Sequence, residues 1–207
     1  MKKVIFTVVL IVLSLTLNAQ NDKGDFQLGA NVGLSMVSVS EITGQNGTDP
    51  RFTANVALSG EYFLSEMWGI KTKLIYDNKG WADGFIFNED TNVNTTTDFK
   101  LSYLTIPVMA NIHFGSNYNW YVNFGPYVGL LLNVEDTALG MDLTDSFKST
   151  DFGLAYGAGY QFVAGETVKL FIELEFQTGF IDVFEINEGN AITNSRVSFN
   201  FGALFNL

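Results

Sequence analysis

The sequence predicts an all-β fold: an eight-stranded antiparallel up-and-down transmembrane β-barrel with four long outer loops and three short periplasmic turns. Three observations support this prediction. Eight segments alternate between apolar and polar residues with a period of two, as strands with one apolar face do. Long and short connections alternate between these segments. The chain also begins with a short basic region followed by an apolar run, which is typical of a secretory leader.

The N-terminal segment is the first element. Two lysines within residues 1–3 precede an apolar run over residues 4–17, and Ala19 stands where signal peptidase would cut. The run is shorter than the ~20 residues that a membrane-spanning helix needs. We therefore predict a signal peptide over residues 1–19 and an outer-membrane β-barrel domain over residues 20–207, with an uncleaved anchor as the alternative. A lipoprotein is excluded because the chain has no cysteine.

The rest of the chain has no apolar stretch that is long enough for a transmembrane helix, so a membrane crossing would use strands of a closed barrel. In each of eight segments one face is apolar, and the other is rich in Gly, Asn and Ser. In the first segment, Phe26 and Leu28 alternate with Gln27 and Gly29. In order, the predicted strands are 26–36, 52–64, 68–77, 103–114, 120–133, 151–162, 169–180 and 196–207.

The connections between these segments alternate in length. The long ones are 37–51, 80–98, 134–149 and 181–194, and the short ones are 65–67, 115–119 and 164–167. Outer-membrane barrels have long outer loops and short periplasmic turns in this alternation. The long connections hold much of the acidic excess of a chain with 22 Asp and Glu against 11 Lys and Arg. Solvation of a cell-surface face explains that excess; divalent-cation bridging to lipopolysaccharide, or partner recognition, is the alternative.

The two faces of the predicted strands differ in a way that favours a membrane barrel. Small polar residues suit the narrow interior of an eight-stranded barrel, which side chains just fill. The apolar face is nearly free of charge, and aromatic residues flank the short turns, where an aromatic girdle belongs. Members of this girdle are Tyr62, Trp68, Phe114, Trp120 and Tyr160. A soluble lipocalin-like barrel, the alternative, would carry its charged face outside.

Charged residues of both signs occur on the polar face and form a candidate site. Because buried charges need partners, we expect them to form a salt-bridged network that fills the lumen; conduction or gating is the alternative role. Glu61 lies one hairpin from Lys71 and Lys73. Glu173 and Glu175 likewise lie one hairpin from Arg196. The predicted network is Glu61, Lys71, Lys73, Asp151, Glu173, Glu175 and Arg196, with Asp77 and Lys169 as further inward charges.

Composition and motifs argue against several functions. A net charge of −11 disfavours nucleic-acid binding. The single histidine, His113, precedes a short turn, and the chain has no GxSxG, HExxH or Walker motif. His113 is therefore expected to be a hydrogen-bonding residue of the rim or lumen and not a catalytic base. We predict no catalytic, cofactor-binding or metal-binding residues, and hence no enzyme.

Three strand motifs carry a family resemblance. The residues YLTIP at 103–107, GPYVG at 125–129 and DFGLAYGAG at 151–159 resemble, in the same order, strands of the PorT-like outer-membrane β-barrel family of Bacteroidota. The resemblance spans essentially the whole mature chain. It implies an eight-stranded outer-membrane barrel of a Gram-negative bacterium without enzyme activity. Some members of that family are linked to protein secretion.

Together these observations predict an integral outer-membrane barrel with a structural or surface-interaction role and a lumen plugged by side chains. The alternative is a small pore, or an accessory component of transport or protein secretion across the outer membrane. The expected partners are outer-membrane lipid and lipopolysaccharide, the barrel-assembly machinery during biogenesis, and a protein of the cell surface or of a secretion system. No cofactor is expected.

Overall fold

The computed structural model describes residues 22–40, 49–88, 92–165 and 167–207. Within these residues eight strands form one closed antiparallel barrel in which each strand pairs with its neighbours in sequence. The strands are β1 (Phe26–Val39), β2 (Arg51–Phe63), β3 (Trp68–Asn88), β4 (Val93–Phe114), β5 (Trp120–Asp136), β6 (Thr150–Val163), β7 (Val168–Gly179) and β8 (Asn194–Asn206). The predicted fold class is therefore confirmed.

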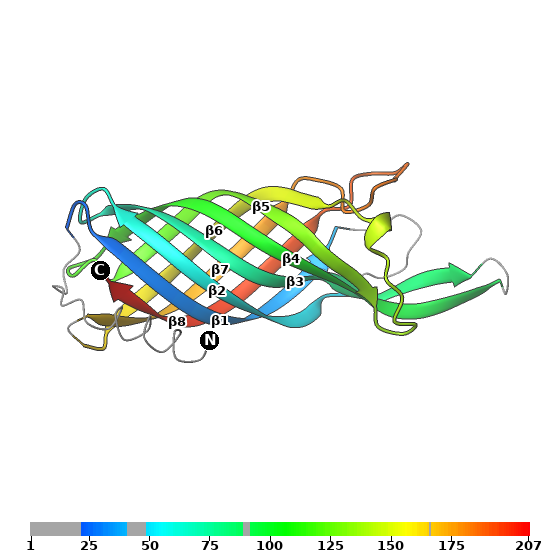
Figure 1. The fold of residues 1–207 in the computed structure, drawn as a ribbon, viewed down its shortest axis with the longest axis horizontal. Helices are drawn as coiled ribbons and strands as arrows, with labels where there is room; N and C mark the ends of the chain where they lie inside the picture. The colour runs from blue at the N-terminus through cyan, green and yellow to red at the C-terminus, as the bar shows by residue number, and fades with distance from the viewer. Residues whose placement is uncertain (1–21, 41–48, 89–91, 166) are drawn as a thin grey trace, which may run out of the picture.

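The barrel closes through the pairing of β1 with β8. This antiparallel ladder runs from Gln27 opposite Asn206 to Val39 opposite Asn194, which is almost the full length of both strands. Closure leaves the barrel wall without an open sheet edge, so the wall satisfies its own backbone hydrogen bonds. The described residues of the short turns lie at the same end as the C-terminus, and those of the long connections lie at the opposite end, called here the loop end (Figure 1).

Side chains alternate between the outer surface and the interior along every strand. On the outer surface, large apolar side chains are exposed, with Leu34 at 74% and Phe52 at 82%. Polar residues such as Asn31 and Ser35 are buried inside. This arrangement reverses that of a soluble barrel and suits a wall that contacts lipid. At the short-turn end, Trp68, Trp120, Tyr62 and Phe114 are exposed on the outer surface, as expected for an aromatic girdle.

The connection predicted over residues 80–98 is not a loop, and this part of the prediction was wrong. Strands β3 and β4 continue as a paired two-stranded ribbon as far as Asn88 opposite Val93. The register shifts between Trp81 and Gly84, where the ribbon leaves the barrel wall. Aromatic and β-branched residues favour extended pairing, and residues 85–87 and 95–97 are of these kinds. The period-two pattern was too short there to be recognised.

The predicted signal peptide, residues 1–19, lies outside the described residues and remains a prediction, as does the domain boundary that follows it. In the part of the chain that the structure describes, no helix is long and apolar enough to cross a membrane. The one helical segment there is a short 3-10 turn over Thr144–Ser146, in the third long connection.

Candidate functional site: the barrel interior

Strand alternation places a balanced set of charges inside the barrel. Among the described residues, and apart from Asp136 at the loop end of β5, the buried charges of the strands are five acidic and five basic side chains. The acidic ones are Glu61, Asp77, Asp151, Glu173 and Glu175, and the basic ones are Lys71, Lys73, Lys79, Lys169 and Arg196. The interior is thus electrically neutral, although the whole chain carries a net charge of −11. A neutral interior favours internal pairing over selection of ions of one sign.

The largest group of these charges crosses the interior from β3 to β7. Lys71 Nζ lies 3.0 Å from Glu173 Oε2, and Lys73 forms ion pairs with both Glu173 and Glu175. The Tyr121 hydroxyl and the Asn123 side-chain amide each donate a hydrogen bond of 3.0 Å to Glu173. Strands that are not neighbours in the sheet are therefore joined through the middle of the barrel.

Arg196 of β8 extends this group. Its guanidinium pairs with Glu175 of β7, and its Nη1 lies 2.9 Å from Asp77 Oδ2 of β3. The Thr105 hydroxyl donates a 3.4 Å hydrogen bond to the same Asp77 oxygen. We call Lys71, Lys73, Asp77, Glu173, Glu175 and Arg196 the central ion cluster. The predicted neighbours Glu175 and Arg196 do meet in it.

A second group lies closer to the loop end, around Asp151 of β6. Lys79 Nζ is 2.8 Å from Asp151 Oδ2, and that oxygen also accepts hydrogen bonds from Tyr127 and Asn194. The Lys79 ammonium lies 4.4 Å from the centre of the Tyr127 ring. Sequence reasoning missed Lys79 because it ended the third strand at residue 77. The alternation along the strand did indicate Lys79, because every second residue faces inward and position 79 follows positions 73, 75 and 77.

Glu61 has different partners from those that its position in the sequence suggests. Although Glu61 lies opposite Lys71 in the β2–β3 register, its carboxylate accepts hydrogen bonds of 2.8 and 2.9 Å from Asn111. His113 Nε2 lies 2.8 Å from Glu61 Oε1. Lys71 and Lys73 instead reach across the interior to β7, because an eight-stranded interior is narrow enough for long side chains to span it. His113 is fully buried near the short turn that follows it.

Apolar side chains cover the interior at the loop end. Trp81 stacks on Phe99 with ring centres 4.5 Å apart, and Phe147 contacts Phe184 from the next long connection at 4.9 Å. Lys148 N–H donates a 2.9 Å hydrogen bond to Val183, which ties the third and fourth long connections together. The mouth cluster comprises Val39, Trp81, Phe99, Leu101, Tyr103, Val134, Phe147, Val183 and Ile192. Sequence reasoning missed it because most of its members lie in predicted loops or at strand ends.

The carboxylates of the barrel interior lie in contact with basic or amide side chains. Within the described ranges, no group of three or more His, Asp or Glu side chains is placed to hold a metal ion. The carboxylates of the central ion cluster are bound by ammonium and guanidinium groups at ion-pair distance.

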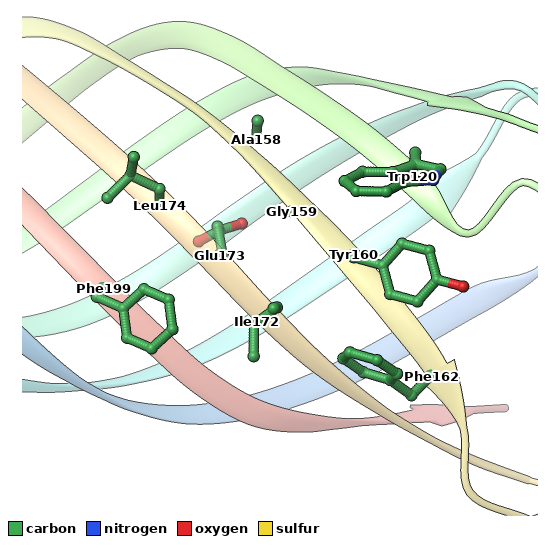
Figure 2. A pocket seen from close by; sticks show the side chains of 9 residues that line it. All are labelled: Trp120, Ala158, Gly159, Tyr160, Phe162, Ile172, Glu173, Leu174 and Phe199. Carbon is green, nitrogen blue, oxygen red and sulfur yellow. The ribbon is translucent and has the colours of Figure 1, made fainter.

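A groove of about 510 Å³ lies on the outer wall near the short-turn end (Figure 2). Trp120 meets Tyr160 edge to face at 4.7 Å, and Tyr160 meets Phe162 at 4.8 Å. The other lining residues are Ala158, Gly159, Ile172, Glu173, Leu174 and Phe199. The Glu173 side chain is buried and belongs to the interior. The groove is therefore part of the apolar wall at the level of the aromatic girdle.

Asp136 organises the third long connection at the end of β5. Its carboxylate accepts hydrogen bonds from the Leu139 and Met141 N–H groups, at 2.6 and 2.7 Å, and one of 3.2 Å from the Thr97 hydroxyl. Glu135 beside it is exposed, so this part of β5 lies beyond the apolar wall. Burial alone would raise the Asp136 pKa, but these hydrogen bonds outweigh it and hold the pKa below the ordinary 3.8.

A pH titration should show the consequence for Asp136. Because the folded pKa is lowered, the stabilisation of the connection is fully present above pH 3.8 and is lost as the pH falls through the lowered pKa. We expect carboxyl NMR signals of Asp136 to titrate below 3.8. At neutral pH, Asp136→Asn should speed proteolytic cleavage at this connection several-fold, whereas the exposed Glu135→Gln should not. Equal cleavage of both variants would contradict this role.

Comparison with known proteins supports the same architecture. A family model described as "Outer membrane protein beta-barrel domain" matches residues 18–185, which is most of the chain. The chain belongs to this outer-membrane β-barrel family. Membership indicates an outer-membrane location and agrees with the apolar outer wall. A search of curated protein sequences found no match.

Solved structures show the fold of this outer-membrane β-barrel in other proteins. The chain is similar to the outer membrane protein OprG from Pseudomonas aeruginosa, with 14% identity and a TM-score of 0.56 over 91% of this chain and 98% of that one. It is also similar to Neisserial surface protein A, with 18% identity and a TM-score of 0.51 over 87% of this chain and 96% of that one. At these identities the likeness concerns the fold alone.

Proposed function

We propose that this outer-membrane β-barrel is a non-enzymatic protein whose lumen is plugged by its own side chains and whose loop end serves a structural or surface-interaction role. The central ion cluster is the observation that carries the proposal. It connects β3, β7 and β8 through the interior and uses ion pairs that are shielded from water.

Two further features support a plugged lumen. Apart from Asp136 at the loop end, positive and negative charges balance inside the wall, so a permeating ion would have to displace existing partners. The mouth cluster adds an apolar layer above the charges at the loop end. An ion crossing this layer would lose its hydration without gaining polar partners. A small pore or a transport accessory needs a continuous polar path through the barrel. The ion-paired side chains and the apolar mouth cluster would both obstruct such a path.

We further propose that residues 1–19 direct export and that the chain is PorT-like and comes from the Bacteroidota. The support is the leader pattern and the three strand motifs at 103–107, 125–129 and 151–159. Outer-membrane lipid, lipopolysaccharide and the barrel-assembly machinery are the proposed partners during and after insertion. The exposed apolar wall and the acidic loop end fit contact with lipid and with the cell exterior.

Planar-bilayer conductance tests the proposed plug. The purified barrel should give no stable unit currents. A variant with Lys71→Ser, Lys73→Ser, Glu173→Ser and Glu175→Ser keeps the interior neutral but removes most of the bulk of the central ion cluster. We expect small unit currents from this variant alone, after a heat-dependent gel shift has shown that it is folded. Stable unit currents from the unaltered protein would rule out the plugged lumen.

A further inference from the structure

The ribbon formed by β3 and β4 extends beyond the barrel wall at the loop end (Figure 1). We call residues 83–88 and 93–98 the outer ribbon. The pairing of β4 with β5 ends at Phe99 opposite Asp136, and on the other side the last contact is an isolated bridge between Asp49 and Ala82. Among the described residues, the outer ribbon therefore has no neighbouring strand on either edge.

Backbone hydrogen bonds define where the free edge of β4 begins. At the base of the ribbon, both backbone groups of Asp98 are hydrogen-bonded to Thr137. The Asp98 C=O accepts a 3.0 Å hydrogen bond from the Thr137 N–H, and the Asp98 N–H donates a 3.3 Å hydrogen bond to the Thr137 hydroxyl. Alternate residues of an antiparallel strand direct their backbone groups to the same side, so Thr96 and Asn94 face the same edge as Asp98. Thr96 and Asn94 lie opposite Phe85 and Phe87 of β3, and no described residue outside that ladder forms a backbone hydrogen bond with either of them.

The β4 edge of the outer ribbon lacks the usual protection of a free edge, because the register shift between Trp81 and Gly84 places its extra residue on β3. Natural edge strands carry lysine, proline or bulges that prevent further pairing. Residues 83–88 and 93–98 contain no lysine, arginine or proline, and include aromatic and β-branched residues that favour strands. Phe87 and Val93 are about half exposed, at 51% and 53%. An unprotected edge of this kind can accept an extended peptide as an additional strand.

The charged side chains beside the β4 edge indicate which charge a binding partner would carry. Asp98 lies at the base of this edge, and a bridge between Glu135 and Asp142 lies next to it on the β5 side. Lys100 lies opposite Glu135 in the β4–β5 register, so these four side chains together carry a net charge of −2. Both bridge residues are exposed. A second copy of this chain would bring the same acidic groups together, which disfavours self-association, whereas a basic segment would be attracted.

We propose that the β4 edge of the outer ribbon, at Asn94 and Thr96, binds an extended basic segment of another protein as an added strand. This inference rests on the surface-interaction role proposed above and gives that role a location and a partner chemistry. Main-chain hydrogen bonds to Asn94 and Thr96 would provide the pairing. The acidic groups Asp98, Glu135 and Asp142 would favour lysine or arginine in the partner.

Peptide binding to the refolded barrel in lipid nanodiscs tests this proposal. The probes are fluorescent nine-residue peptides that alternate Thr or Val with Lys, matched peptides with Glu in place of Lys, and basic peptides N-methylated at alternate positions. Thr96→Pro removes the N–H that faces the free edge without removing a bond to β3, and Thr96→Val keeps the backbone intact. A heat-dependent gel shift shows that each variant is folded.

We expect fluorescence anisotropy to show binding of the basic peptide, at least tenfold weaker binding to Thr96→Pro, and unchanged binding to Thr96→Val. The acidic and N-methylated peptides should bind at least tenfold more weakly than the basic one. Unchanged affinity in Thr96→Pro, or no binding of the basic peptide, would overturn the proposal. Self-association that Thr96→Pro abolishes, without peptide binding, would assign the edge to a second copy instead. Conductance of the unaltered protein would refute the plug without affecting this result.

Discussion

Replacing Glu173 with alanine is expected to destabilise the folded barrel by about 3–5 kcal/mol, the usual cost of leaving a buried charge without its partner. Glu173 pairs with Lys71 and Lys73 and accepts hydrogen bonds from Tyr121 and Asn123. Lys73 keeps Glu175 when Glu173 is removed. Lys71 has no second carboxylate at ion-pair distance among the described residues, so its ammonium would remain buried and unpaired. Urea-dependent unfolding in lipid vesicles, followed by tryptophan fluorescence, measures the loss.

A second substitution distinguishes charge imbalance from lost volume. Adding Lys71→Met to Glu173→Ala restores neutrality and should return most of the lost stability, because an apolar side chain can replace a buried ion pair at little cost. The single variant Glu173→Gln retains the volume but still leaves the charge of Lys71 unpaired, so it should remain destabilised. If the double variant were no more stable than Glu173→Ala, the ion pair would not be the source of the effect.

Gly80→Ala is expected to destabilise the barrel by roughly 2–4 kcal/mol and to disturb the base of the outer ribbon. Gly80 has a φ of +112°, which side-chain-bearing residues rarely adopt. A Cβ atom at this position would lie 2.0 Å from the carbonyl oxygen of Phe99 on the paired strand. Backbone strain and a backbone clash therefore act together. Chemical unfolding measures the stability, and amide exchange of residues 93–98 measures the disturbance.

Gly140→Ala is the matched control for Gly80→Ala. Gly140 also has a positive φ, +66°, but a Cβ atom there would meet nothing within 4 Å. Its substitution should cost only the strain, about 1 kcal/mol. A loss for Gly80→Ala no larger than that for Gly140→Ala would show that β3 and β4 separate readily at Phe99, contrary to the close approach in the structure.

The sequence predicted the wall of the barrel better than its interior or its loop end. All eight strands were predicted from period-two alternation, because lipid on one side and a packed interior on the other impose opposite polarity on successive residues. The same alternation put Lys71, Glu173 and Arg196 on the inner face, where the structure has them. It could not show which of them meet, because position along the chain does not reveal distance across a barrel.

Partner choice inside the barrel depends on stagger and closure. Glu61 and Lys71 are opposite each other in the β2–β3 register, yet Glu61 is bound by Asn111 and His113 while Lys71 reaches Glu173. The tilt of the strands and the pairing of β1 with β8 decide which inward side chains face one another. Neither the strand tilt nor the β1–β8 pairing can be deduced from the polarity of neighbouring residues in the sequence.

By itself, the sequence determined the number of strands, the polarity of their two faces and the mixture of charges that faces inward, since these follow from local side-chain chemistry. Only the tertiary structure decided the ion pairs across the lumen, the mouth cluster and the projecting outer ribbon. Each of these depends on contacts between residues far apart in the chain, as between Lys71 and Glu173 or Phe147 and Phe184. Closing the barrel brings such residues together, and no short stretch of sequence encodes that closure.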